Sequence, residues 1–124
     1  MRTIIYQRVI YRDDLMNNPD VFYLFGDNIE RVGIGGQAME MRGELNAIGI
    51  ATKKRPNRDE SSYMTDKEYV ENIKVIDEDF KKIPKDCIVV IPSSGLGTGL
   101  AQLPTRAPRT YSYLLKKLKE LGED

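Results

Sequence analysis

Two glycine-rich segments of this 124-residue sequence have the composition of loops that bind phosphate through backbone amides. Residues 25–38 and residues 92–104 each follow an apolar run of strand length and precede a helical pattern. Because glycine has no Cβ, its N–H group can approach a phosphate closely, and a following helix adds partial positive charge. We therefore expect both segments to lie at the carboxyl ends of strands and to hold a diphosphate between them. The glycines concerned are Gly33, Gly35, Gly36, Gly95, Gly97 and Gly99.

The spacing of these glycines differs from that of the better-known phosphate loops. The sequence contains no GxxxxGK(S/T) segment, and residues 33–38, GIGGQA, do not match GxGxxG. The alternative interpretation is that the glycines only form tight turns and allow close packing of helix against strand.

Polar residues near the first segment have two interpretations each. Asp27 and Asn28 end a strand, where they either bind a ligand or form a turn. Arg31 and Arg42 either reach a phosphate or lie in solvent. Lys53 follows the apolar run 47–51, and it either lies at the mouth of a phosphate pocket or belongs to a solvated basic run.

Composition excludes several classes of chemistry. The chain has no His and a single Cys, so a Ser-His or Cys-His nucleophile pair, a His metal ligand and an intramolecular disulfide are all excluded. Cys87 begins an apolar run and is expected in the core. Lys and Arg total 19, as do Asp and Glu, which argues against a general nucleic-acid binder. We expect no metal, cofactor or membrane span, and a soluble protein of a reducing cytoplasm.

Hydrophobic patterning predicts one domain, residues 1–124, in which strands alternate with helices. Continuous apolar runs indicate strands buried on both faces, which favours an α/β three-layer sandwich (α/β/α) with a mostly parallel or mixed sheet. Residues 52–64, including Tyr63, are expected to form an exposed loop, from which Tyr63 could stack on a base. The expected strands are 3–11, 21–25, 47–51 and 87–91, and a helical turn is expected at 13–18 with a short helix at 36–43.

Two longer helices have clear sequence signals. A capping box, Thr65 with Glu68, predicts the start of a helix that Pro84 ends. The last helix is expected from near Thr105 to Gly122, with Pro108 in its first turn.

The order of these segments resembles the macrodomain superfamily, which binds ADP-ribose. The likeness is closest to the subgroup that removes terminal ADP-ribose from glutamate side chains. It is found in RVGIGGQ (31–37), AIGIATKKR (47–55), the helix at 68–83 and IPSSGLG (91–97). The pattern FGDN…RVGIGGQA…RG…NAIGIATK is also similar to small phage-encoded proteins, which implies a host cytoplasm.

The resemblance implies a compact macrodomain-like fold that binds ADP-ribose or a related NAD-derived nucleotide. In the hydrolase subgroup a lysine attacks the anomeric carbon, and the matching position here is Lys53. The acidic partner is absent, because its position is Gly99, so Asp27 is the substitute acid–base candidate. The expected ligand-binding residues are Asp27, Asn28, Arg31, Gly33, Gly35, Gly36, Gln37, Ser94, Gly95, Leu96, Gly97, Thr98 and Gly99.

One alternative from a different class remains open. The segment 3–11 could form an exposed edge strand that pairs with another chain. The protein would then be a non-catalytic interaction or oligomerising protein.

Overall fold

A computed structural model describes residues 1–123 of the chain. Its elements are β1 (Thr3–Gln7), α1 (Arg12–Asn17), β2 (Val21–Asn28), α2 (Ala38–Met41), β3 (Ala47–Lys53), α3 (Tyr69–Phe80), β4 (Ile88–Pro92), α4 (Leu103–Arg106) and α5 (Pro108–Leu121). Two short 3-10 turns, Glu60–Ser62 and Asp66–Glu68, precede α3.

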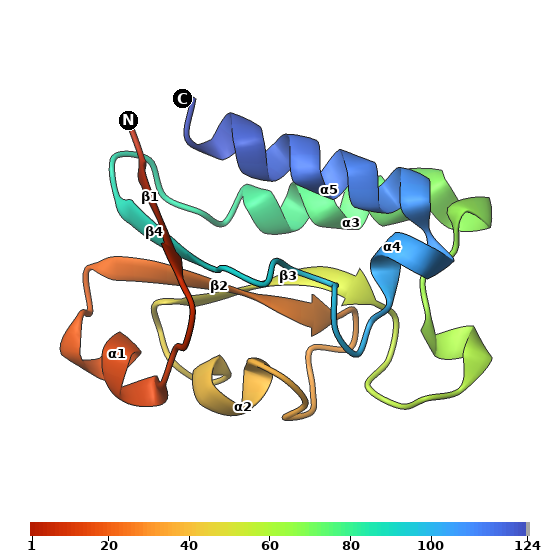
Figure 1. Ribbon diagram of the computed structural model, residues 1–124, viewed down its shortest axis with the longest axis horizontal. Helices are drawn as coiled ribbons and strands as arrows, with labels where there is room; N and C mark the ends of the chain where they lie inside the picture. The colour runs from red at the N-terminus through yellow and green to blue at the C-terminus, as the bar shows by residue number, and fades with distance from the viewer. Residues whose placement is uncertain (124) are drawn as a thin grey trace.

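The four strands form one all-parallel sheet in the order β1-β4-β2-β3. Helices α3 and α5 cover one face of the sheet, and α1 and α2 lie against the other (Figure 1). The α/β fold with a parallel sheet is therefore confirmed, and of the two sheet types expected from the sequence the parallel one is formed.

Apolar side chains fill the space on both sides of the sheet. Leu24, Ile50 and Val89 pack in the larger core beneath α3 and α5. Tyr23 and Phe25, which flank Leu24 in β2, point to the opposite face and pack beside α2. Because successive residues of a strand point to opposite faces, a strand that is covered twice must be apolar at every position. This explains the continuous apolar runs in the sequence.

The N-terminal strand is shorter than expected. We expected a strand over 3–11, but β1 ends at Gln7. A chain reversal follows, and the Gln7 side-chain amide donates to Val9 O at 2.9 Å. Helix α1 then begins at Arg12. The later residues of the apolar and aromatic run therefore belong to a turn rather than to the sheet.

The capping box expected at Thr65 and Glu68 does not form. A neighbouring carboxylate, Asp66, instead caps helix α5. Thr65 makes no side-chain cap bond, and Glu68 instead pairs with Lys54 at 2.5 Å. Asp66 accepts hydrogen bonds from the backbone N–H groups of Arg109 and Thr110, at 2.8 and 3.0 Å. These two amides belong to the first turn of α5, so Asp66 satisfies donors that have no partner within that helix.

The expected C-terminal helix is divided into two. Ala107, at φ −146°, separates α4 from α5, and Pro108 is the first residue of α5. A residue before proline avoids the helical conformation, whereas proline suits the first helical position. Gly122 ends α5, as expected.

The expectation that residues 52–64 form an exposed loop is wrong at both ends of the segment. Thr52 and Lys53 belong to β3 and are buried, and an antiparallel bridge joins Lys53 to Tyr63. Ser62 and Met64 are buried as well. The middle of the segment, 57–61, is exposed. The segment lacks apolar periodicity because contacts to the rest of the fold, rather than a regular element, bury its ends.

No helix within residues 1–123 is long and apolar enough to cross a membrane.

Candidate functional site

The two glycine-rich segments meet at the carboxyl end of the sheet. The segment after β2 leads to α2 on one face, and the segment after β4 leads to α4 and α5 on the other face (Figure 1). Strands β2 and β4 are neighbours in the sheet, but the segments that follow them run to opposite faces. Open α/β sheets usually bind ligands at such a point. A cleft of about 430 Å³ lies at this point.

The floor of the cleft leaves no room for side chains. A Cβ on Gly97 would lie 3.0 Å from Thr52 Cγ2 and 3.1 Å from Leu103 Cβ. Gly97 also has φ +75°, which L side chains rarely adopt. A Cβ on Gly26 would lie 3.3 Å from the backbone nitrogen of Gly97. Glycine at 26 and 97 therefore brings the backbones of β2 and the second segment together.

The segment after β4 has backbone donors without partners beside the cleft. The Thr98 hydroxyl donates to Ser94 O at 2.8 Å, and Gly97 O and Gly99 O accept from the N–H groups of Leu103 and Gln102. In contrast, the N–H groups of residues 96–101 donate no hydrogen bond to any group within residues 1–123. The loop uses its carbonyls internally and leaves its amides unpaired.

The segment after β2 has the same imbalance. The side chain of Arg42 donates to Gly33 O at 2.7 Å, and Asn28 Nδ2 donates to Val32 O at 2.7 Å. The N–H groups of residues 32–37 have no acceptor in the part of the chain that the structure describes. A peptide N–H points opposite to its C=O, so the amides that follow Val32 and Gly33 face away from Arg42 and Asn28.

Two buried side-chain oxygens near the segment after β2 also lack hydrogen-bond partners. Gln37 Oε1 and Asn28 Oδ1 are buried and accept no hydrogen bond within residues 1–123. An unsatisfied buried acceptor is costly, so each is suited to a water or ligand that carries an O–H or N–H group. Gln37 lines the cleft, whereas Asn28 does not.

No charged side chain lines the cleft. The lining consists of Gly26, Gly35, Gly36, Gln37, Thr52, Ser94, Gly95, Gly97, Thr98, Gly99, Leu100 and Ala101. An anion there would be held by neutral amides, and the lining contains no acid–base group. Gly99, the residue at which the resemblance leads one to expect an acid, is among the lining residues.

The two arginines that were candidates for phosphate binding are paired with carboxylates. Arg31 Nη2 lies 2.7 and 2.9 Å from the two oxygens of Asp79, which is fully buried. Arg42 Nη2 lies 2.6 Å from Asp27 Oδ1, and Arg31 Nη1 lies 3.7 Å from Asp27 Oδ2. Both guanidinium groups already have anionic partners, so their interactions position the first segment.

Lys53 is buried outside the cleft. Its Nζ donates to Asn57 O and lies 4.5 Å from the centre of the Tyr63 ring. Burial, with the nearby charges of Arg58 and Arg106, lowers the pKa of the Lys53 amine below its usual value. Tyr63 is also buried, and the guanidinium of Arg106 lies 3.7 Å from its ring centre, so the ring is not available to stack on a base.

The structure thus brings together most of the glycines and hydroxyls expected at the site, but not its charged residues. Gly35, Gly36, Gln37, Ser94, Gly95, Gly97, Thr98 and Gly99 line the cleft. Asp27, Asn28, Arg31, Gly33, Lys53 and Leu96 do not line it. Leu96 is a core residue, and a Cβ on Gly33 would meet Pro56 at 3.0 Å. Sequence reasoning missed Gly26, Thr52, Leu100 and Ala101. The positions of the first two at the ends of apolar strands could have indicated them.

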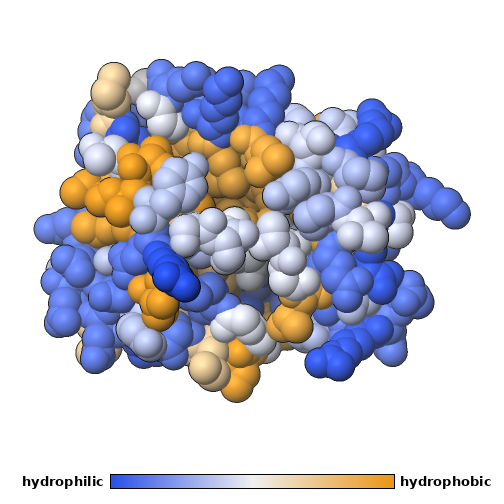
Figure 2. Space-filling view, viewed as in Figure 1, coloured by the Kyte–Doolittle hydropathy of each residue, from blue (hydrophilic) through white to orange (hydrophobic). Residues whose placement is uncertain are grey.

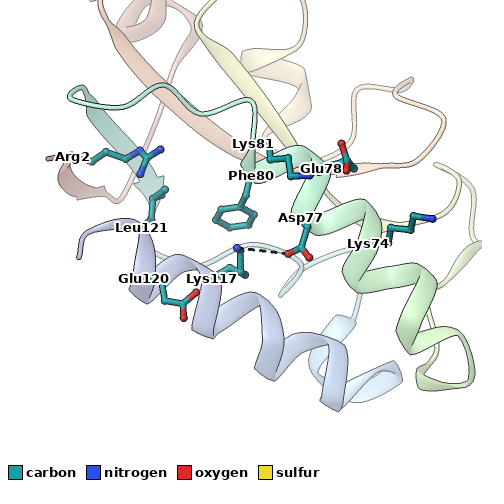
Figure 3. Close-up of a pocket in the computed structure, with 9 residues that line it drawn as sticks. All are labelled: Arg2, Lys74, Asp77, Glu78, Phe80, Lys81, Lys117, Glu120 and Leu121. Atoms are coloured by element: carbon teal, nitrogen blue, oxygen red, sulfur yellow. Dashed lines mark hydrogen bonds and ion pairs between the residues drawn. The ribbon is translucent and has the colours of Figure 1, made fainter. Parts of the chain in front are cut away.

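A second, larger hollow lies between α3 and α5. This α3–α5 groove has a volume of about 530 Å³, and Phe80 and Leu121 are among its lining residues (Figure 3). Four of its charged side chains pair with one another: Lys117 lies 3.7 Å from Asp77, and Lys81 lies 3.1 Å from Glu78. In residues 1–123 no group of three acidic or cysteine side chains could hold a metal ion.

Comparison with known proteins yields a family. Residues 5–117 match the model of a family described as "Family of unknown function (DUF7831)". The matched range includes β2, β3 and β4, the last three residues of β1, and both segments that form the cleft. No curated protein and no solved structure matches the chain.

Proposed function

Since the chain belongs to the family of unknown function DUF7831, we propose its function from its own geometry: it binds ADP-ribose or a related NAD-derived nucleotide. The diphosphate would lie in the cleft between the segments after β2 and β4. The observation that carries this proposal is the run of unpaired backbone amides in both segments, at residues 32–37 and 96–101.

A diphosphate suits a cleft lined by amides. Its oxygens accept hydrogen bonds only, and bonds from N–H groups to an ionised oxygen are about twice as strong as those between neutral groups. Backbone "nests" of successive N–H groups bind phosphate without any cationic side chain. The glycines at 35, 36, 95, 97 and 99 allow the ligand to approach the backbone.

The rest of the cleft favours a nucleotide over inorganic phosphate. The buried Gln37 Oε1 needs a donor, which a ribose hydroxyl or an adenine amino group supplies. Leu100 lines the cleft and is 57% exposed, so its side chain offers apolar surface to a sugar or base. The order of segments shared with macrodomains supports the same ligand class.

The contacts favour binding over hydrolysis. A nucleophilic role for Lys53 would require its Nζ to leave Asn57 O and reach a cleft that it does not line. Asp27, the substitute acid, lies between two arginines and is 7% exposed. With no acid–base group in the lining, we expect turnover of ADP-ribosyl substrates to be absent or very slow.

Isothermal titration calorimetry with ADP-ribose, NAD, ADP and AMP tests the proposal. We expect ADP-ribose to bind with micromolar affinity and more tightly than AMP, because AMP lacks the second phosphate. Gly35→Val and Gly97→Val, each checked by circular dichroism for a native fold, should lose this binding. No heat with any of the four ligands, or undiminished binding in both variants, would contradict the proposal.

A further inference from the structure

The two edge strands of the sheet, β3 and β1, differ in how many of their outward backbone groups are hydrogen-bonded. At β3, side chains occupy the outward backbone groups: Arg31 Nη1 donates to Gly49 O at 3.4 Å, and Ala51 N donates to Asp79 Oδ2 at 2.8 Å. The bridge between Lys53 and Tyr63 covers the end of the same edge. The β3 edge therefore has few groups left to pair with another strand.

The β1 edge has no such cover. Thr3 N donates to Cys87 O at 2.9 Å and Ser93 N donates to Gln7 O at 3.0 Å, so alternate residues from Thr3 to Gln7 bond to β4. The residues between them, Ile4 and Tyr6, direct their N–H and C=O groups away from the sheet. None of these four groups has a hydrogen-bond partner among residues 1–123.

Apolar side chains surround this open edge. Ile5 is 43% exposed, Tyr6 is 60% exposed, and Ile88 in the neighbouring strand is 38% exposed. Helices α1 and α2 lie over β2 and do not shield Ile5. Figure 2, drawn from the side on which β1 is the nearest strand, shows apolar surface on both sides of it. Unpaired backbone groups with flanking apolar side chains fit one kind of partner, an extended strand.

We propose that the partner is a second copy of this chain, paired antiparallel through β1 about a two-fold axis at Ile5. In this register Ile4 faces Tyr6 of the partner, and each pair exchanges two N–H···O bonds. The outward groups of Ile4 and Tyr6 are thereby all used. Ile5 faces the partner's Ile5 across the axis, so the most central side chains are apolar in both copies.

The charges at the ends of the strand are also complementary. Arg8 is exposed and makes no ion pair within residues 1–123. The two-fold axis places it near the start of the partner's β1, beside which the partner's Asp86 lies. The Asp86 side chain is 79% exposed and is held there by the N-terminal amine. Arg2, the residue directly opposite Arg8, is buried and donates to Ile83 O and Pro84 O, which turns its charge away from the edge.

The contact between the two copies is small, so we expect the dimer to be weak. Five residues of strand span about 17 Å at ~3.4 Å per residue. Such a contact is below the ~800 Å² per partner of a typical stable interface. We therefore expect a reversible dimer with a micromolar dissociation constant, which combines two four-stranded sheets into one.

Sedimentation velocity of the full chain over a micromolar to millimolar concentration range tests the proposal. We expect a concentration-dependent shift from monomer to dimer. Tyr6→Lys should abolish the shift, because it places two charges on the contact. Val70→Lys is the matched control, since Val70 is 69% exposed on α3, and it should leave the shift unchanged. A chain that remains monomeric throughout, or a Tyr6→Lys variant that dimerises like wild type, overturns the proposal.

A cross-link tests the register independently of affinity. In a Cys87→Ser background, Ile5→Cys places two thiols on the axis with Cα atoms about 4.5 Å apart, within disulfide range. Mild oxidation should then give a covalent dimer in good yield. Tyr6→Cys places the thiols two residues out of register, beyond ~7 Å, and should give little. Equal yields from the two variants, or no dimer from Ile5→Cys, contradict the proposed pairing.

Discussion

The cleft at the end of the sheet and the α3–α5 groove are hollows of similar volume with opposite chemistry. The cleft has no charged side chain, but the backbone N–H groups of residues 32–37 and 96–101 have no acceptor within residues 1–123. The groove is rich in charged side chains, but several of them pair with one another. An incoming anion gains little where it must compete with an ion pair already formed, and it gains most where donors are unpaired. We therefore propose the cleft, rather than the larger and more highly charged groove, as the site that binds an anion.

The largest expected effect comes from closing the cleft. Gly97→Val places a branched side chain against Thr52 and Leu103 at a φ of +75°, so it both fills the floor and strains the backbone. We expect affinity for ADP-ribose to fall by at least ~100-fold, which is ~2.7 kcal/mol. Calorimetry measures the affinity, and thermal unfolding measures the accompanying loss of stability.

A core variant separates the two effects of that substitution. Leu118→Ala removes buried side-chain volume from α5 and should cost about 2–4 kcal/mol of stability. At a temperature where it remains folded, its affinity for ADP-ribose should equal that of wild type. Equal losses of affinity in the two variants would mean that Gly97→Val acts only through stability.

A smaller effect is expected from the residue that orients the first segment. Arg42→Ala removes the donors to Gly33 O and Val32 O and takes from Asp27 the nearer of its two arginine partners. We expect the segment 32–37 to lose its fixed orientation, and affinity to fall ~10-fold, or ~1.4 kcal/mol. Arg109→Ala, an exposed arginine on α5, is the matched control and should leave the titration curve unchanged.

Beside the groove, the expected effect is on stability and depends on pH. The Tyr113 hydroxyl donates to Asp77 at 2.5 Å, and this bond raises the pKa of Tyr113 from 10.0 to about 12. A pKa raised by folding means that the contribution of this group is complete below pH 10 and is lost as the pH rises through 12. Solvent screening limits that contribution to about 1 kcal/mol.

Comparison with Tyr113→Phe isolates this contribution. Denaturant unfolding of both proteins should show a stability difference that is constant up to about pH 9 and shrinks towards pH 12. A difference that grows with pH would have the wrong sign. Ligand affinity at neutral pH should be the same in both proteins, because neither Tyr113 nor Asp77 lines the cleft.

The smallest effect is expected from a charge in the groove. Lys117→Ala removes a partly exposed partner of Asp77, a pair worth ~0.2–1 kcal/mol at most. We expect a stability change within ~0.5 kcal/mol and unchanged affinity for ADP-ribose. If this variant instead lost ligand affinity, the contrast between cleft and groove would be wrong and the groove would be the site.

Local patterns in the sequence predicted the elements and the position of the glycine segments. The continuous apolar runs 21–25 and 47–51 lie in strands, and the run 87–91 does so from residue 88 on, because burial on both faces demands apolar residues at every position. The segments that follow two of these strands must then meet at one end of a parallel sheet. Five of the six glycines of the cleft lining, all but Gly26, were identified for that reason.

The positions of the charged residues could not be predicted in this way. Asp79 pairs with Arg31 across 48 residues, and Asp66 caps a helix 43 residues later. Lys53 and Tyr63 read as loop residues, but the edge of the sheet buries both. Such partners are set by how the elements pack, since residues far apart in the chain leave no common period in the sequence.

The sequence by itself determined the α/β class, most of the strands and helices, and the two glycine segments, because burial and backbone freedom act over a few neighbouring residues. Only the tertiary structure decided the strand order, and with it which strands are the edges and which segments form the cleft. It also decided that Arg31 and Arg42 bind carboxylates and that the amides of residues 32–37 and 96–101 have no acceptor in the described part of the chain. These outcomes depend on which distant groups come within hydrogen-bond distance, and packing alone sets those distances.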